Sequence, residues 1–203
     1  MGAVLLGWIA STALGACADN AGLSLTAALA LLWLALAPLV RVGGPARSAS
    51  LVVACSAPYF AFAIVADHAA GAAWQVLALR ATLSAAWCAG LAASGASACE
   101  RRRGAAWLAA YFAVVCAVPL VSLALAMGGD GARWSVVESL ESVSPLAWAV
   151  RALPQSSASF EAWGALLAPA LLPTGAVLAL AWWARRGAAQ EVRVAPSKSP
   201  GAA

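Results

Sequence analysis

Charged residues are scarce in this chain: Asp, Glu, Lys and Arg make up 10% of its 203 residues, whereas 64% are hydrophobic. A soluble domain of this length needs charged and polar side chains over most of its surface, so this scarcity excludes a soluble globular fold. The composition also excludes a disordered chain. The net charge of +4 comes from a few loop residues and does not indicate binding to nucleic acid. The composition indicates an integral membrane protein.

Residues that carry chemistry are equally rare. The one histidine, His68, excludes a bis-His haem. We interpret His68 and the adjacent Asp67 as an exposed pair in an outer loop, since no Gly-x-Ser-x-Gly motif accompanies them. The one lysine, Lys198, is in the C-terminal tail, which excludes a P-loop in this chain. The sequence therefore predicts no catalytic, cofactor or metal site, and ATP and Mg²⁺ would have to be bound by a partner subunit.

The cysteines fall at no metal-ligand spacing, and we interpret them as small apolar side chains. They are Cys17, Cys55, Cys88, Cys99 and Cys116. Residues 14–17 also resemble a lipoprotein processing box, so the first apolar segment either spans the membrane or is processed at Cys17. The missing basic segment before it favours the first alternative.

Uncharged runs of about 20 residues, enough to cross a hydrocarbon layer of about 30 Å, predict membrane-spanning helices. The runs are continuous, whereas apolar residues alternate in the strands of a membrane barrel. The candidate spans are six: 2–18, 21–40, 48–66, 72–95, 105–127 and 164–184. Residues 1–186 are therefore expected to form an all-α integral membrane domain with six transmembrane helices. Residues 187–203 are expected to be a disordered cytoplasmic tail.

Charges are divided unevenly between the two sides of these spans. One side holds nine of the twelve basic residues: Arg41, Arg47, Arg101, Arg102, Arg103, Arg185, Arg186, Arg193 and Lys198. The other side holds six of the eight acidic residues: Asp19, Asp67, Asp130, Glu138, Glu141 and Glu161. Because Lys and Arg accumulate in cytoplasmic loops, the basic side and both termini are expected to be cytoplasmic. The alanine-rich composition favours a bacterial inner membrane.

The connection between the fifth and sixth spans, residues 130–162, has a helical pattern of its own. Apolar residues on one face of 136–143 predict an amphipathic helix at the outer interface. Ser144 is a candidate N-cap and Pro145 a first helical residue for a second short helix. Together they predict a broken amphipathic hairpin at the outer side, either a gate or an interfacial loop without a gating role. Its candidate gate residues are Ser144, Pro145, Leu146, Trp148 and Arg151.

Three stretches of the chain resemble the membrane-spanning permease subunit of type-2 ATP-binding-cassette (ABC) exporters. The first is the Ser-Pro-Leu segment with its following Trp, residues 144–153. The second is the last span with its basic end, residues 176–186. The third is a small-residue helix, a basic turn and an Ala-rich helix, residues 90–107. The chain departs from the family pattern at its start, where the family has an amphipathic surface helix.

This resemblance implies a permease that exports a lipid, a drug or another amphipathic substrate. It further implies a dimer with an identical or a different membrane domain, and a separate cytosolic ABC ATPase that supplies the energy. The candidate coupling residues for that ATPase are Arg41, Arg47, Arg101, Arg102 and Arg103. A non-transporting membrane scaffold or assembly subunit is the main alternative, and an intramembrane enzyme is a third.

Arg80 is the one charged residue well inside a predicted span, about 12 Å from its start. A charge at such depth is costly to insert, which favours a functional role. Arg80, with Gln75, is therefore a candidate for the substrate path, or it binds an acid on a neighbouring helix. The alternative is that its side chain snorkels outward beside Gln75. Within the last span, Pro169 and Pro173 predict kinks or breaks, and Thr174 is available to satisfy a freed carbonyl.

Overall fold

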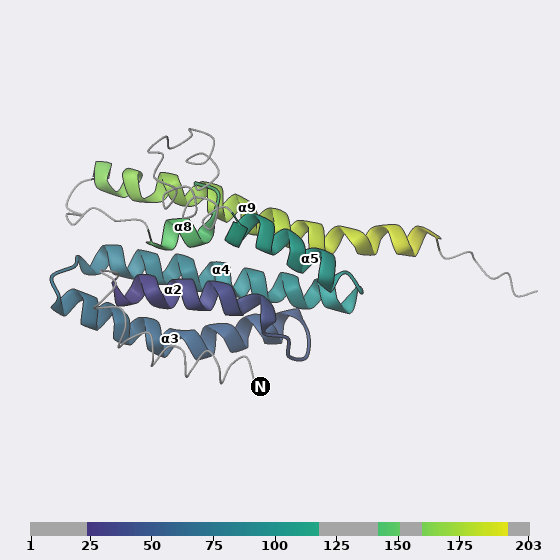
Figure 1. Cartoon of the computed structure of the whole chain (residues 1–203), viewed down its shortest axis with the longest axis horizontal. Coiled ribbons are helices and arrows are strands. Elements are labelled where there is room, and N and C mark those ends of the chain that lie inside the picture. The colour runs from purple at the N-terminus through teal and green to yellow at the C-terminus, as the bar shows by residue number, and fades with distance from the viewer. Residues whose placement is uncertain (1–23, 118–141, 151–159, 195–203) are drawn as a thin grey trace, which may run out of the picture.

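The computed structural model describes residues 24–117, 142–150 and 160–194, and every regular element in these ranges is a helix (Figure 1). The all-helical class is confirmed for this part of the chain. In chain order the elements are α2 (Leu25–Leu36), the 3₁₀ turn η1 (Ala37–Leu39), α3 (Pro45–Ala69), α4 (Trp74–Glu100), α5 (Gly104–Tyr111), the π-helix η2 (Phe112–Ala117), α8 (Pro145–Val150) and α9 (Phe160–Val194).

Three helical segments are long and apolar enough to cross a membrane: α3, α4 and Leu167–Arg186 within α9. The 25 residues of α3 extend about 37 Å, more than the hydrocarbon layer requires. Two shorter apolar helical segments cover Leu25–Leu39 and Gly104–Val115. These findings are consistent with a membrane protein. The predicted first span, 2–18, lies outside the described residues, as do the first residues of the second span and those of the fifth beyond 117.

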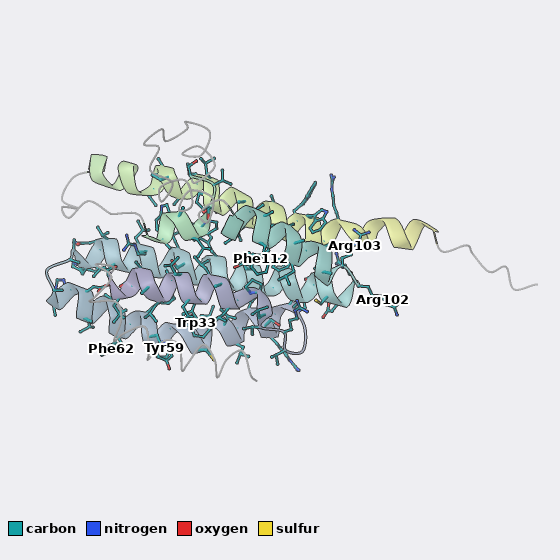
Figure 2. The ribbon with its side chains drawn as sticks, in the orientation of Figure 1. Trp33, Tyr59, Phe62, Arg102, Arg103 and Phe112 are labelled. Atoms are coloured by element: carbon teal, nitrogen blue, oxygen red, sulfur yellow. The ribbon has the colours of Figure 1, made fainter. Side chains whose placement is uncertain are left out.

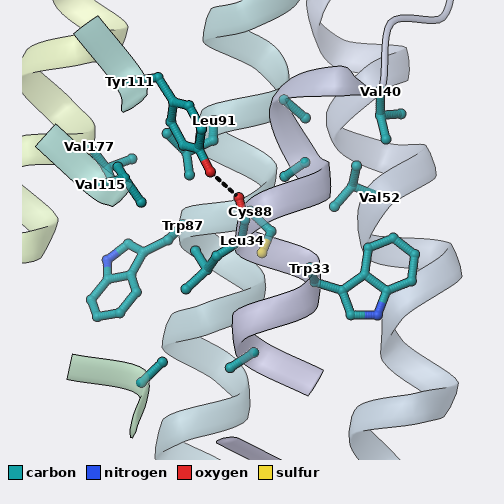
Figure 3. Packing of buried hydrophobic residues seen from close by; sticks show 14 of the residues in the cluster. Trp33, Leu34, Val40, Val52, Trp87, Cys88, Leu91, Tyr111, Val115 and Val177 are labelled. Carbon is teal, nitrogen blue, oxygen red and sulfur yellow. Dashed lines mark hydrogen bonds between the residues drawn. The ribbon is translucent and has the colours of Figure 1, made fainter. Parts of the chain in front are cut away.

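Helix α4 occupies the centre of the bundle and contacts α2, α3, α5, α8 and α9. Figure 1 shows α2 and α3 along one side of α4 and α5 and α9 along the other, with α8 between α4 and α9. The buried core follows this arrangement. Trp33 and Leu34 of α2, Leu91 of α4, and Trp107 and Tyr111 of α5 are all at most 2% exposed. In Figure 3, Trp33 points toward α3, on the opposite side from Trp87 of α4.

A proline in η1, directly after α2, is the reason for one of the hydrogen bonds between helices. Pro38 has no N–H, so the carbonyl of Leu34, four residues earlier, loses its α-helical donor. The phenol of Tyr111 donates to that carbonyl at 2.7 Å, within the core (Figure 3). A buried carbonyl without a donor is costly, so the hydrogen bond both satisfies α2 and fixes α5 against it.

A second backbone carbonyl, that of Val115 in η2, also accepts a hydrogen bond from a side chain. The hydroxyl of Ser144 donates to that carbonyl at 2.8 Å and is fully buried. Ser144, which we predicted as a helix cap and a gate residue, therefore also joins α8 to η2.

Helix α9 has different boundaries from those predicted. It begins at Phe160, inside the predicted hairpin 130–162, and continues to Val194, past the expected start of the tail at 187. The helix is continuous through Pro169 and Pro173, so these prolines do not break it. Residues 188–193 include Ala, Gln, Glu and Arg, which are good helix formers, and no proline interrupts the helix before Pro196. Residues 195–203 lie outside the described residues.

Candidate functional site

The four predicted gate residues that the structure describes lie in or directly before a short helix inside the bundle. Ser144 caps α8 as predicted: its hydroxyl accepts from the amide of Ala147 at 3.4 Å and its carbonyl from that of Trp148 at 3.1 Å. Pro145 is the first residue of the helix. Pro145 is buried, and Leu146 packs half-buried against the core. Arg151 and most of the predicted amphipathic helix 136–143 lie outside the described residues.

Trp148 shows how deeply α8 lies in the bundle. Its ring is 3% exposed and contacts Trp87 edge to face, with ring centroids 5.0 Å apart. Trp87 is the middle residue of the 27-residue α4. Helix α8 also contacts α2, α9 and η2. It therefore reaches the middle of the bundle, deeper than a loop resting on the outer helix ends, and a gating role for it stays a prediction.

Trp87 connects α8 to the last helix. Its indole N–H donates to the hydroxyl of Thr174 at 3.1 Å, and that hydroxyl donates to the carbonyl of Ala170 at 2.7 Å. The hydroxyl of Thr174 therefore bonds to the carbonyl of Ala170, whereas Pro173 frees the carbonyl of Pro169, so the structure does not confirm the predicted role of Thr174. A movement of α8 would act directly on α4 and α9 through these contacts.

A cavity of about 300 Å³ lies beside this contact, between α4 and α9. Along α4 it is lined by small and apolar side chains, and α9 supplies the facing wall. The lining side chains include Leu83, Trp87, Gly90, Ala93, Ser97, Thr174, Val177 and Arg185. The predicted path residues Arg80 and Gln75 do not line this cavity.

Arg80 and Asp67 belong to a buried polar cluster at the beginning of α2, which we call the capped end (Ser24, Thr26, Asp67 and Arg80). The carboxylate of Asp67 accepts from the amides of Leu25 and Thr26, each at 2.8 Å, and from the hydroxyl of Thr26 at 2.6 Å. These bonds satisfy amides that the start of a helix leaves without intrahelical partners, and they place a negative charge at the positive end of the helix dipole. Asp67 is thus a structural cap for α2.

The guanidinium of Arg80 completes the cluster. It donates to the hydroxyl of Ser24 at 3.0 Å, and that hydroxyl accepts from the amide of Ala27 at 3.2 Å. Arg80 is 6% exposed, and the carboxylate of Asp67 lies in the same cluster. This burial argues against a snorkelling side chain, which would reach the water interface. A place in a substrate path and binding of an acid on a neighbouring helix both stay predictions. Gln75 is half-buried in the first turn of α4.

The prediction that Asp67 and His68 form an exposed pair in a loop is wrong about the loop, because both lie in the last turn of α3, and is right about exposure for His68 alone. His68 is exposed, and its Nδ1 lies 2.9 Å from the carbonyl oxygen of Ala72, next to the turn before α4. Asp67 is only 7% exposed, because its carboxylate turns inward to the amides of α2. The pair is therefore split between solvent and core. The residues that the sequence interpretation missed, Ser24 and Thr26, carry the usual signal of a helix cap before an apolar run.

The predicted coupling residues gather at the opposite end of the bundle. Together with two arginines of α9 they form what we call the basic end (Arg41, Arg47, Arg101, Arg102, Arg103, Arg185 and Arg186). Arg102 and Arg103 lie where α4 meets α5 (Figure 2), and both are exposed, as are Arg41 and Arg47. Arg101 is half-buried and donates to the carbonyl of Ala184 in α9 at 2.6 Å. This bond brings the basic part of α9 beside the turn that contains Arg101–Arg103.

The turns at the basic end contain residues with a positive φ angle. Gly43 and Gly44 have φ of 60° and 103°, and Arg102 has φ of 57°. Glycine adopts such φ values without strain, which allows the short connection from η1 to α3. The turn then brings Gly44 next to Glu100, so Arg41 and Arg47 lie near the other arginines.

Within the described ranges, no group of three or more His, Cys, Asp or Glu side chains is placed to hold a metal ion. Of the cysteines described, Cys88 is fully buried in the core and Cys55 packs against it. No family model, curated protein or solved structure matches the chain.

Proposed function

We propose that this chain is the six-span permease subunit of a type-2 ABC exporter, moving a lipid, a drug or another amphipathic substrate. A separate cytosolic ATPase would supply the energy, because the only lysine of this chain lies in its tail and no P-loop is present. The subunit would pair with a second membrane domain in a bacterial inner membrane, with its termini and basic end in the cytoplasm.

The observation that carries the proposal is the position of α8. A half-helix that begins with Ser144-Pro145-Leu146 directly precedes the last long helix and packs against the middle of α4 through Trp148. An outer segment inserted this far can respond to a rearrangement of α4 and α9, as the gate of an exporter must. The cavity between α4 and α9 adds an apolar space with polar groups, which suits an amphipathic substrate.

The basic end supports a cytosolic partner. Arg41, Arg47, Arg102 and Arg103 are exposed on the turns between helices, where a docked ATPase would contact them. Exposed guanidinium groups form bidentate hydrogen bonds with carboxylates, so acidic residues of a partner are their natural counterparts.

The test is to purify the tagged full chain from the cells that produce it, in a gentle detergent, and to identify stoichiometric partners by mass spectrometry. We expect a protein with a P-loop. The double variant Arg102→Lys/Arg103→Lys keeps the positive charge that orients the chain but loses the guanidinium geometry. It should recover severalfold less ATPase, whereas the control Arg186→Lys should recover the wild-type amount. Recovery of other membrane subunits and no P-loop protein would contradict the proposal.

A non-transporting membrane scaffold is the second candidate, and the capped end favours it. Arg80, the charge expected to line a substrate path, lies in the same buried hydrogen-bonded cluster as Asp67 and Ser24. Trp148→Ala distinguishes the two candidates in the ATPase-bound complex. An exporter should lose substrate-stimulated ATP hydrolysis, whereas the exposed control Trp182→Ala should retain it.

A further inference from the structure

The cavity between α4 and α9 has a volume of about 300 Å³, at the small end of the range for ligand sites. Its α4 wall follows one helix face through Leu83, Gly90, Ala93 and Ser97. Leu83 and Ser97 are 14 positions apart, or about 21 Å along the helix axis. The two helices approach each other closely at Gly90, where an added Cβ would lie 3.1 Å from Cγ1 of Val177. The space is therefore narrow and elongated.

Polar groups are distributed unevenly along this space. Near the middle of α4, the indole of Trp87 and the hydroxyl of Thr174 are bonded to each other. Toward the basic end, Ser97 is 9% exposed and lines the cavity, and its hydroxyl has no hydrogen-bond partner in the part of the chain that the structure describes. This oxygen is not fully buried, so it is accessible from the cavity and can form a hydrogen bond with a ligand.

A positive charge lies at the same end. Arg185 lines the cavity and is exposed, and neither an ion pair nor a hydrogen bond to another described residue occupies its guanidinium. Arg101 and Arg186 are close neighbours, the first through its bond to the carbonyl of Ala184. An occupant of this cavity therefore needs an anionic group at the basic end and an apolar chain along Leu83 and Val177.

We propose that the cavity binds an anionic phospholipid from the leaflet at the basic end. One acyl chain lies between α4 and α9, the phosphate contacts Arg185, and the hydroxyl of Ser97 donates to a headgroup or ester oxygen. The narrow apolar space fits a single chain, and the charge of Arg185 is complementary to the headgroup. This inference concerns the same cavity as the proposed transport but does not depend on it, since a lipid can bind here whether or not an ATPase is attached.

The experiment is native mass spectrometry of the purified full chain, titrated with dioleoyl phosphatidylglycerol and, separately, dioleoyl phosphatidylcholine. We expect one phosphatidylglycerol to bind at least about tenfold more tightly than phosphatidylcholine. Arg185→Gln should weaken phosphatidylglycerol binding about tenfold, the usual effect of losing one charge-assisted hydrogen bond. The matched control Arg186→Gln removes the adjacent charge, which stacks on Trp182 outside the cavity, and should change affinity less than about twofold.

A second variant tests the cavity itself. Ala93 is half-buried on its wall, so Ala93→Phe fills the space and should abolish the tight binding. If this variant does not fold, judged by size-exclusion chromatography, Ser97→Ala replaces it and should weaken binding severalfold. Equal affinity for the two lipids, equal losses in Arg185→Gln and Arg186→Gln, or full binding by the folded cavity variant would each overturn the proposal.

Discussion

The capped end and the basic end of the bundle both carry charge, but in opposite environments. At the capped end, Asp67 and Arg80 are less than 10% exposed, and both form hydrogen bonds at the beginning of α2. At the basic end, Arg41, Arg47 and Arg102 are exposed to the surroundings. Buried charge that is hydrogen-bonded determines whether helices assemble, whereas exposed charge is free to orient the chain and to meet partners. Substitutions at the two ends should therefore affect different properties.

The largest effect should come from Asp67→Ala. It removes three hydrogen bonds to Leu25 and Thr26 and leaves Arg80 without its opposing charge. We expect the free energy of unfolding to fall by about 3 kcal/mol or more, since breaking a buried charged contact has effects of that size. Thermal unfolding of the full chain in detergent, followed by circular dichroism, measures the change.

Glu100→Ala is the matched control at the other end, because Glu100 is an exposed acid in the last turn of α4. Its unfolding midpoint should equal that of the wild type. Equal midpoints for Asp67→Ala and Glu100→Ala would refute the structural role of the capped end.

Arg80→Ala should have the next largest effect, about 2 kcal/mol, because it removes a partly buried, charge-assisted hydrogen bond to Ser24. If Asp67 and Arg80 stabilise each other, the double variant should be more stable than the sum of the single losses predicts, by about 1 kcal/mol or more. Unfolding of the two single variants and the double variant measures this coupling. If the losses of stability of the two single variants add up to that of the double variant, Arg80 acts independently of Asp67. A place in the substrate path would then be the better explanation for Arg80.

The sequence indicates those features of the fold that depend on local patterns. The apolar runs that became α3 and α4 and the cap at Ser144 required only neighbouring residues to be recognised. The partners of Asp67 could not be found in this way, since Thr26 is 41 residues distant in the chain. The sequence shows that Arg80 is charged, which favoured a functional role. It does not show that Arg80 is buried with Ser24, because that depends on how three helices pack. The cavity likewise results from the approach of α4 and α9 and has no local signature.

Tyr111→Phe extends the comparison to the middle of the bundle, with a smaller effect. The variant leaves the carbonyl of Leu34 without the phenol donor, which should lower the free energy of unfolding by about 1–2 kcal/mol. In a Pro38→Ala background the restored amide can serve that carbonyl, so the same substitution should have less effect. Equal losses in the two backgrounds would contradict the link between the proline and the phenol. Tyr59→Phe, at a half-buried position on α3, is the control and should leave stability unchanged.

The smallest effect on stability is expected at the basic end, from Arg102→Gln/Arg103→Gln. Both side chains are exposed, and surface charges contribute little to folding. Detergent unfolding should therefore match the wild type. The same double variant removes two positive charges from one loop, so it should weaken the orientation of the chain in the membrane. Labelling of the native exposed loops with an impermeant reagent in intact cells and in inverted vesicles measures that orientation. A large loss of stability without any change in labelling would contradict this prediction. It would mean that the charges at the basic end, like those at the capped end, stabilise the fold and do not orient the chain.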